Sequence, residues 1–415
     1  MARLIIFKYT ALVNSNYMES NILENIIHHN EGRKPDLLEM KYRGMGKSIF
    51  KFYRSTATVF YQDVSANNFL LNSPKVWACG DLHFENFGSY KGDNGLVYFD
   101  INDFDEATLA PCLFDIARFL VSVVLLAETE GYPEEGAIML CEAFVASYTE
   151  TLATGNSRWV EKQTASGVIK NLLENVERRK PLYKVYTNKV GGSRQFDFTH
   201  KKLIPPTAEE KKHILEIIRN WHLLSKAKNI YNILDLAYHI KGSGSLGIKR
   251  YILLVQHKSD NTYKLVDLKM STPPCLNQYV THITQPQWKN EAERTVEIQK
   301  RVQGTSQALL ESIETNESSF VLREYQSHED KVRLRMCRGK INEVKEIITT
   351  MAKITAWGQL QSGGRQGSCI TDELIEFSQN NSSWSKDIMT FTFQYADKVR
   401  NDYKEFCKPK FQNML

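Results

Sequence analysis

Residues 80 to 115 read GDLHFENFGSYKGDNGLVYFDINDFDEATLAPCLFD, and this stretch decides which fold and which site the chain can form. It concentrates acidic, amide and imidazole side chains more densely than a fold needs for its stability. The polar residues are Asp81, His83, Glu85, Asn86, Asp100, Asp103, Asp105 and Glu106. Two apolar runs carry them, KVWAC before Gly80 and LVYF before Asp100. We expect such a cluster to face a metal ion, a phosphate group or both.

A tight turn separates the two apolar runs. It reads Gly92-Asp93-Asn94-Gly95, and Asn-Gly between strand-forming residues is a strong hairpin signal. The hairpin would place residues 81–86 beside residues 100–105. Neighbouring carboxylates repel one another and stay charged most readily when a divalent cation lies among them. Asn86 can add a neutral oxygen to the same ion, which suits Mg²⁺ bound by one or two carboxylates plus substrate phosphate.

The order of these motifs resembles a known family pattern. G-D-L-H-x-x-N, a hairpin, D-F-D, and then D-I-A twelve residues after Asp103 are similar to the catalytic core of the aminoglycoside and choline phosphotransferases, which have the protein-kinase-like fold. The resemblance implies that Asp81 is the catalytic base and that Asn86 and Asp103 bind metal, Asp103 at the nucleotide phosphates. His83 belongs to the same catalytic loop, where we expect it chiefly to hold the loop through its ring nitrogens.

Nearly the whole chain also resembles a bacterial family catalogued as domain of unknown function 2252. The matching phrases are KSIFKFYRST (47–56), ACGDLHFENFG (78–88), FDINDFDEA (99–107), GSGSLGIKRYILL (242–254), VDLKMS (266–271) and YADKVRNDY (395–403). This resemblance names no substrate.

Three aspartates compete for the second metal-ligand position. Asn86 to Asp103 is seventeen residues, longer than is usual in the phosphotransferases, whereas Asn86 to Asp100 is fourteen. The spacing to Asp115 favours Asp103. Asp100 and Asp105 stay open as alternatives.

A second informative stretch begins with Gly242-Ser-Gly244-Ser-Leu-Gly247 and continues through IKRYILLVQ, the polar turn HKSDN, and YKLVDLKM. A G-x-G-x-x-G motif alone is weak evidence. A Rossmann fold needs a helix after the glycines, and this β-branched run predicts a strand instead. A glycine loop followed by strand, turn and strand, with Lys269 ending the second strand, resembles a kinase, where the loop covers the phosphates and the Lys pairs with them. The alternative is a hairpin with a flexible entry.

The residues after Lys269 extend this resemblance. In kinases a helix at this place supplies a Glu that pairs with the Lys. Within the helical region 285–313, Glu297 is the best candidate and Glu293 lies one turn earlier. Residues 318–326, SSFVLREYQ, predict a strand that would line the adenine pocket.

Together these features favour an α+β, two-lobed, protein-kinase-like fold that is mostly helical with a small antiparallel sheet. Kinases place the glycine loop before the catalytic loop, but here it follows about 160 residues later, which favours a circular permutation. The expected units are a catalytic-loop and helical lobe (1–230), a nucleotide lobe (231–335) and a helical segment packing on the first lobe (336–415). In a competing arrangement, residues 49–64 form a degenerate N-terminal lobe, and the chain after about residue 230 is a separate α+β domain.

The apolar stretch Leu113 to Ala127, LFDIARFLVSVVLLA, predicts a buried helix that contains Asp115 and Arg118. A buried carboxylate needs partners. The family resemblance implies that Asp115 braces the catalytic loop through backbone N–H groups. An ion pair between Asp115 and Arg118 within the helix is an equal alternative.

Composition is consistent with a cytoplasmic enzyme. At 415 residues the chain is long enough for two lobes, and its net charge of +5 is spread along the sequence, which predicts no nucleic-acid partner. Seven cysteines without a C-x-x-C motif indicate reduced thiols. Residues 1–16 have too short an apolar run for a signal peptide, and no run of 18 apolar residues predicts a membrane span.

Three function classes follow. The leading one is an ATP- and Mg²⁺-dependent phosphotransferase that acts on an unknown small-molecule or protein hydroxyl. The second is a kinase-like protein that binds nucleotide without catalysis or transfers AMP. The third is a metal-dependent phosphoesterase, since G-D-x-H occurs there too, but the chain lacks the further histidine motifs that a binuclear site needs.

Overall fold

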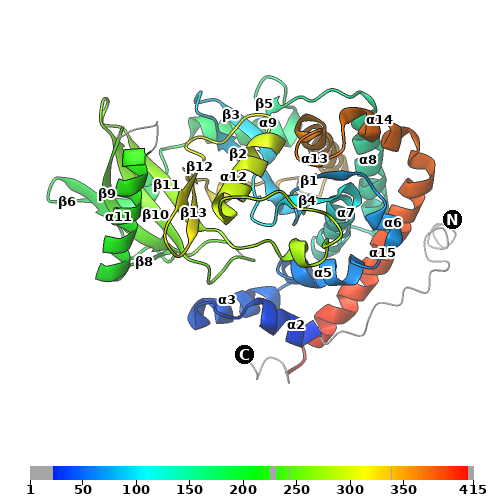
Figure 1. Cartoon of the computed structure of the whole chain (residues 1–415), viewed down its shortest axis with the longest axis horizontal. Coiled ribbons are helices and arrows are strands. Elements are labelled where there is room, and N and C mark those ends of the chain that lie inside the picture. Colours follow the sequence, from blue (N-terminus) through cyan, green and yellow to red (C-terminus); the bar gives the residue numbers. More distant parts are fainter. Residues whose placement is uncertain (1–21, 225–229, 243, 338, 410–415) are drawn as a thin grey trace.

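The computed structural model describes residues 22–224, 230–242, 244–337 and 339–409. Residues 1–16, for which we expected no targeting segment, lie outside this part. The described chain is a mixed α+β structure in which helices predominate and the sheets are small and antiparallel, as expected. In Figure 1 the largest sheet lies on the left and most helices lie on the right.

One long buried helix lies at the centre of the helical part. This helix, α7 (Cys112–Thr129), is buried at every position from Cys112 to Ala127 and packs against α8, α15 and α4. A helix that is apolar on all sides is stable only when other elements surround it. The helices of this part are α2 (Ile22–His29), α3 (Pro35–Met45), α4 (Ile49–Arg54), α5 (Ala57–Val64), α6 (Asn68–Leu71), α7, α8 (Glu134–Ala153), α9 (Gly167–Arg178), α13 (Ile341–Ser362), α14 (Thr371–Gln379) and α15 (Asn381–Phe406).

The competing arrangement for residues 49–64 is wrong. These residues form helices α4 and α5, and their apolar side chains belong to the same core as α7. They are therefore part of the helical body and form no separate lobe.

The predicted hairpin is confirmed. β2 (Phe87–Lys91) pairs antiparallel with β3 (Val97–Ile101), and Gly95 in the turn has a φ of +78°, which suits glycine. Two shorter pairings flank it. The strands of these small sheets are β1 (Lys75–Ala78) with β4 (Thr108–Pro111), and β5 (Val160–Glu161) beside β3; a 3₁₀ turn, η1 (Phe84–Asn86), precedes β2.

A six-stranded antiparallel sheet carries the second informative stretch. Its order is β12-β13-β11-β10-β9-β8. The strands are β8 (Leu203–Ile204), β9 (Tyr231–His239), β10 (Arg250–His257), β11 (Tyr263–Met270), β12 (Glu311–Glu314) and β13 (Ser319–Glu324). The expected strand within residues 318–326 is thus confirmed as β13.

Helices pack on both faces of this sheet. Ile214, Ile217 and Ile218 of α11 (Ala208–Leu224) pack against one face, and α12 (Glu291–Val302) packs on β12 and β13. Both β8 and α11 precede residue 231, where we expected the nucleotide lobe to begin, so the folded unit around the sheet starts earlier in the chain. The remaining elements are α10 (Tyr183–Tyr186), the pair β6 (Thr187–Val190) and β7 (Ser193–Phe196), and the 3₁₀ turns η2 (Cys275–Gln278), η3 (His328–Asp330) and η4 (Leu334–Cys337).

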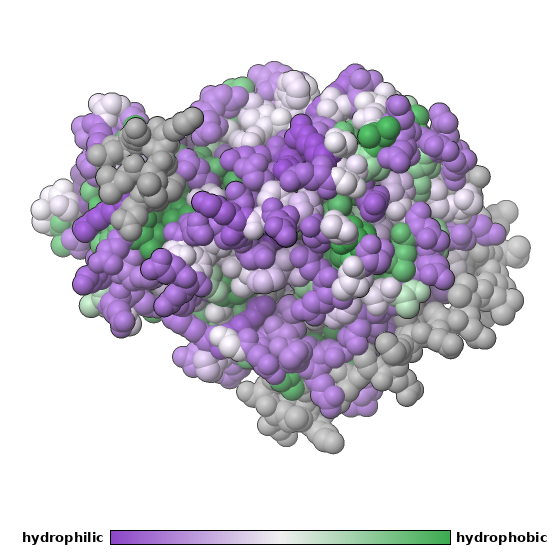
Figure 2. All heavy atoms as spheres, in the orientation of Figure 1, coloured by the Kyte–Doolittle hydropathy of each residue, from purple (hydrophilic) through white to green (hydrophobic). Residues whose placement is uncertain are grey.

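Hydrophilic residues predominate on the face shown in Figure 2, with small separate apolar patches. Within the described ranges, none of the helices is both long and apolar enough to cross a membrane. All seven cysteines are free thiols.

Candidate functional site

The loop that carries Asp81, residues 79–86, is held in place by hydrogen bonds to Asp115 of α7. One carboxylate oxygen of Asp115 accepts a hydrogen bond from the backbone N–H of Cys79 (2.7 Å), and the other accepts from Gly80 (3.0 Å). Burial raises the pKa of Asp115 to about 6, and these two N–H groups oppose the increase. The bracing role that the family resemblance implies is therefore present, and Asp115 does not pair with Arg118. We call residues 79–86 the Asp81 loop.

A second loop, residues 102–107, packs directly on the Asp81 loop, and we call it the Asp103 loop. Gly80 has a φ of +83°, and a side chain there would collide with the backbone carbonyl of Glu106, so only glycine fits. The thiol of Cys79 donates to the carbonyl of Asp103 (3.0 Å). These contacts fix the two acidic loops against each other.

Asp81 has a different partner on each side. Its Oδ1 accepts from Nε of Arg118 (2.5 Å), whose side chain is fully buried beneath the loop. Its backbone carbonyl accepts from the side-chain amide of Asn86 (2.6 Å). Because the Asn86 nitrogen is used in this way, its Oδ1 is left as an oxygen donor for a cation. The predicted residues Asp81 and Asn86 are thus brought together.

Lys269 pairs with the Asp103 loop. Its Nζ forms an ion pair with Oδ2 of Asp105 across 164 residues of sequence. Burial lowers the pKa of Lys269 to about 8, and the charge of Asp103 opposes this decrease. Burial alone would raise the pKa of Asp103, but Lys269 and the nearby Lys331 keep it below its ordinary value. Asp103 therefore stays ionised even without a bound metal ion.

The two informative stretches meet at one cavity of about 450 Å³. Its lining combines both loops with the glycine loop, residues 242–247. The predicted residues that line it are Asp81, His83, Asn86, Asp103, Asp105, Gly242, Gly244 and Gly247. Lys269 reaches its wall through Asp105.

Two oxygen donors in this cavity fit a divalent cation. Asn86 and Asp103 offer one amide oxygen and one carboxylate, the number of protein ligands that Mg²⁺ takes when phosphates and water complete its coordination. Within the described ranges, no group of three or more His, Cys, Asp or Glu side chains is placed to hold a metal ion without such help. A cation here would depend on the ligand that it accompanies.

His83 links the Asp81 loop to helix α4. Its Nδ1 faces the backbone N–H of Glu85 (3.1 Å), and its Nε2 faces Nε of Arg54 (3.2 Å). Burial lowers the pKa of His83 well below its usual value, so the ring is neutral and can accept from only one of the two donors. Arg54 also forms an ion pair with Glu85. These contacts fit the expected loop-holding role of His83.

The glycine loop is tied to the helices at the start of the described chain. Gly244 presents its carbonyl to Nη1 of Arg33 (2.6 Å) and to Nζ of Lys41 (2.9 Å). Arg33 also donates to the carbonyl of Leu246 (3.1 Å), and Lys41 to Oδ1 of Asn30 (2.6 Å). Lys41 is almost fully buried on α3. Two cationic side chains thus converge on one carbonyl of the glycine loop.

The expected pairing of Glu297 with Lys269 is not found. Glu297 lies on an exposed face of α12 and contacts Lys300 (3.4 Å). Glu293 accepts from the backbone N–H of Lys289 (2.6 Å) at the start of the helix. The α12 side chain that faces the site is Arg294, which donates to the carbonyls of Asp105 (2.8 Å) and Thr272 (3.2 Å). Asp105 takes the role of Lys269 partner that we expected for Glu297.

Asp100 is not placed to bind a metal ion in this cavity. Its Oδ1 accepts from the N–H of Ile101 (2.7 Å), and its Oδ2 accepts from the N–H of Gly304 (3.1 Å). Burial raises the pKa of Asp100 to about 7, partly offset by these two N–H groups. It is absent from the described residues that line the cavity. Asp100 instead attaches the hairpin to the chain after α12.

Sequence reasoning missed three cationic residues that line the cavity, Arg33, Arg54 and Lys331. Arg54 lies within the phrase KSIFKFYRST that carried the family resemblance, so a signal for it existed. Lys331 donates to the carbonyl of Glu85 (2.9 Å), and burial lowers its pKa to about 8. No local pattern marks Lys331, because the fold brings it to the Asp81 loop from 246 residues away.

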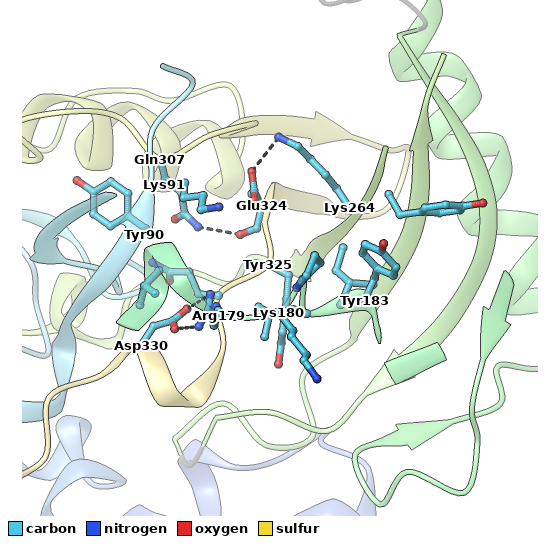
Figure 3. A pocket seen from close by; sticks show the side chains of 16 residues that line it. Tyr90, Lys91, Arg179, Lys180, Tyr183, Lys264, Gln307, Glu324, Tyr325 and Asp330 are labelled. Carbon is cyan, nitrogen blue, oxygen red and sulfur yellow. Dashed lines mark hydrogen bonds and ion pairs between the residues drawn. The ribbon is translucent and has the colours of Figure 1, made fainter. Parts of the chain in front are cut away.

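A second cavity, of about 240 Å³, lies near the same sheet but holds none of the predicted site residues (Figure 3). Four of its charged side chains form two ion pairs. Arg179 forms two hydrogen bonds with Asp330, and Lys264 pairs with Glu324 (3.1 Å). Eight of the predicted site residues therefore line the 450 Å³ cavity, and none lines this one.

Comparison with known proteins identifies the family of the chain and no activity. A family model described as "Uncharacterized protein conserved in bacteria (DUF2252)" matches residues 33–409, and the chain belongs to that family. Searches of the curated proteins and of the solved structures found no match.

We expect Lys41→Met to loosen the glycine loop. The substitution removes the Nζ donor to the Gly244 carbonyl, and a loss of about 1 kcal/mol for that hydrogen bond corresponds to roughly fivefold faster backbone exchange. Hydrogen-exchange mass spectrometry of a peptide covering residues 244–248 measures this. Lys47→Met, at an exposed position just after α3, is the control. Unchanged exchange in the Lys41 variant would show that the hydrogen bond from Lys41 to the Gly244 carbonyl does not hold the glycine loop.

Proposed function

We propose that this member of the DUF2252 family is a Mg²⁺- and ATP-dependent phosphotransferase that acts on a hydroxyl acceptor. One observation carries the proposal. Asp81, Asn86 and Asp103 line the same cavity as the glycine loop, and Lys269 is paired with Asp105 at its wall. Phosphoryl transfer in kinases requires a base, oxygen ligands for a cation, a glycine-rich loop over the phosphates and a lysine.

The order of elements around the glycine loop supports a permuted kinase-like fold as part of this proposal. β9, the glycine loop, β10, β11 with Lys269, α12, β12 and β13 follow one another as in a nucleotide lobe. The Asp81 loop and the hairpin precede them in sequence. In an ordinary kinase the glycine-loop elements come first in the sequence and the catalytic loop second. The proposed permutation joins the two ends of such a chain and opens it between these two groups of elements.

Each residue has a proposed role that follows from its contacts. Arg118 holds Oδ1 of Asp81, which orients the carboxylate toward the cavity so that it can accept the proton of an acceptor hydroxyl. Asn86 and Asp103 would hold the cation, and Lys269 would face the phosphates. Bound Mg²⁺-ATP supplies the phosphoryl group and the positive charge that offsets its oxygens. His83 and Asp115 maintain the loop geometry.

A second candidate function uses the same site. Transfer of AMP in place of phosphate, or nucleotide binding alone, would need the same cation ligands and the same lysine. Incubation with Mg²⁺ and ATP labelled at the γ or the α phosphate separates the possibilities: γ label on an acceptor supports the proposal, α label supports AMP transfer, and neither supports a binding role.

The substitution Asp81→Asn should reduce turnover by about 10²–10⁴-fold, the usual contribution of a general base. Binding of Mg²⁺-ATP should change little, because Asp81 is not among the proposed cation ligands. Release of γ label to water or acceptor measures turnover, and calorimetry measures binding. Asp93→Asn, in the hairpin turn, is the matched control. Wild-type turnover in the Asp81 variant would remove the proposed base role.

The pH dependence gives an independent check on Asp81. Burial raises its pKa to about 6, and the charge of Arg118 opposes the increase. A base must be ionised, so turnover should fall as the pH drops through about 6 and should be constant above it. Arg118→Gln removes the opposing charge, so the pH at which turnover falls should become higher. Arg118→Lys keeps a cation and should leave this pH near 6. A pH that is unchanged in both variants, or becomes lower in Arg118→Gln, contradicts the assignment.

A further inference from the structure

A strip of charged side chains lies next to Lys269 on the sheet. In the antiparallel register, Arg250 is opposite Lys269 and Arg323 is opposite Asp267. Since alternate residues of a strand share one face, Lys269, Asp267 and Arg323 point to the same side of the sheet, together with Arg250. We call Arg250, Asp267 and Arg323 the charged strip.

The charged strip is closed by its own contacts. Arg250 donates from Nε and Nη2 to the two carboxylate oxygens of Asp267 (2.7 and 2.5 Å), and both side chains are buried. Arg323 approaches Asp267 (3.6 Å) and donates to the carbonyl of Asn102 (3.2 Å) in the Asp103 loop. The Asp103 loop thus contacts the strip, and the three side chains of the strip are only 2% to 11% exposed.

Beyond the strip, Lys241 fills the space toward residues 325–327, which follow β13. Its Nζ donates to the carbonyl of Gln326 and lies 4.4 Å from the ring centre of Tyr325. A planar nucleobase that entered here would have to displace Lys241 and break the buried ion pair between Arg250 and Asp267. This would leave buried charges unpaired, which is energetically costly.

The lining of the large cavity agrees with this closure. Among the described residues that line it, none belongs to β13 or to residues 325–327. We expected β13 to line an adenine pocket, and it does not reach the cavity. The apolar side chains that line it are Ala57, Cys79, Ile248, Met270, Pro273 and Cys275, and none of the described lining residues is Phe, Tyr or Trp.

We propose that the site binds the phosphate donor through its triphosphate group and its cation and has no pocket for the nucleobase. The site would then accept nucleoside triphosphates regardless of their nucleobase. This inference rests on the proposed function. A base is distinguished when it is buried in a fitted pocket with hydrogen-bond partners, and the closed strip offers neither.

The charge around the cavity favours such a ligand. Asp103 is surrounded by Lys269, Lys331, Arg323 and Arg250. Asp267 takes up the charge of Arg250, and Asp105 that of Lys269, whereas Lys331 has a backbone carbonyl as its hydrogen-bond partner. Lys331 is therefore a lining cation for which no ion pair with a described carboxylate is found, and such a cation suits the oxygens of a triphosphate group.

The test compares the Mg²⁺ complexes of ATP, GTP, CTP and inorganic triphosphate in calorimetric titrations of the full chain. The four dissociation constants should agree within about fivefold, because no contact depends on the base. Lys269→Met should weaken all four by a similar factor, at least about tenfold. Lys264→Met is the matched control, since Lys264 is on the same strand but on the opposite face of the sheet and should leave all four unchanged.

Two outcomes would overturn the inference, and they differ in meaning. If ATP binds more than about tenfold tighter than CTP and inorganic triphosphate, a base pocket exists and the inference fails while the proposed function stands. If none of the four ligands binds, the proposed function fails and the inference fails with it.

Discussion

The buried carboxylate of Asp115 accepts hydrogen bonds from the backbone N–H groups of Cys79 and Gly80, and it thereby holds the Asp81 loop on which the Asp103 loop packs. These bonds fix the direction in which the chain leaves β1. Gly80 then allows the Asp103 loop to approach within contact of the Asp81 loop. Since α7 is buried on all sides, the carboxylate that it presents cannot shift without disturbing the core.

The charges of the site are arranged so that one carboxylate remains available. Asp81 is paired with Arg118, and Asp105 is paired with Lys269. Asp103 has cations around it but forms no ion pair with another described side chain, and Asn86 donates from its nitrogen to the Asp81 carbonyl, which leaves its amide oxygen available. This division explains why neighbouring aspartates in one short sequence have different roles: pairing uses up two of them and leaves Asp103 for a ligand.

The sequence predicted the features that depend on local signals. The Asn-Gly turn predicted the β2–β3 hairpin, the apolar run predicted buried α7, and the glycines followed by β-branched residues predicted β10 and β11. It failed where the answer depends on how an element is rotated or on a distant contact. Glu297 lies on the outer face of α12, Asp100 is turned toward Gly304, and Lys331 contacts Glu85 from 246 residues further along the chain. Spacing along the chain does not encode any of these orientations.

The central claim is that Asp103 holds the cation that accompanies a bound triphosphate. The most direct measurement is calorimetric titration of ATP, with and without Mg²⁺, into the wild type, Asp103→Asn and Asp100→Asn, with circular dichroism to confirm that each variant is folded. We expect Asp100→Asn to keep the Mg²⁺-dependent part of the affinity and Asp103→Asn to lose most of it. Mg²⁺-dependent binding that survives in Asp103→Asn but is lost in Asp100→Asn would contradict this claim.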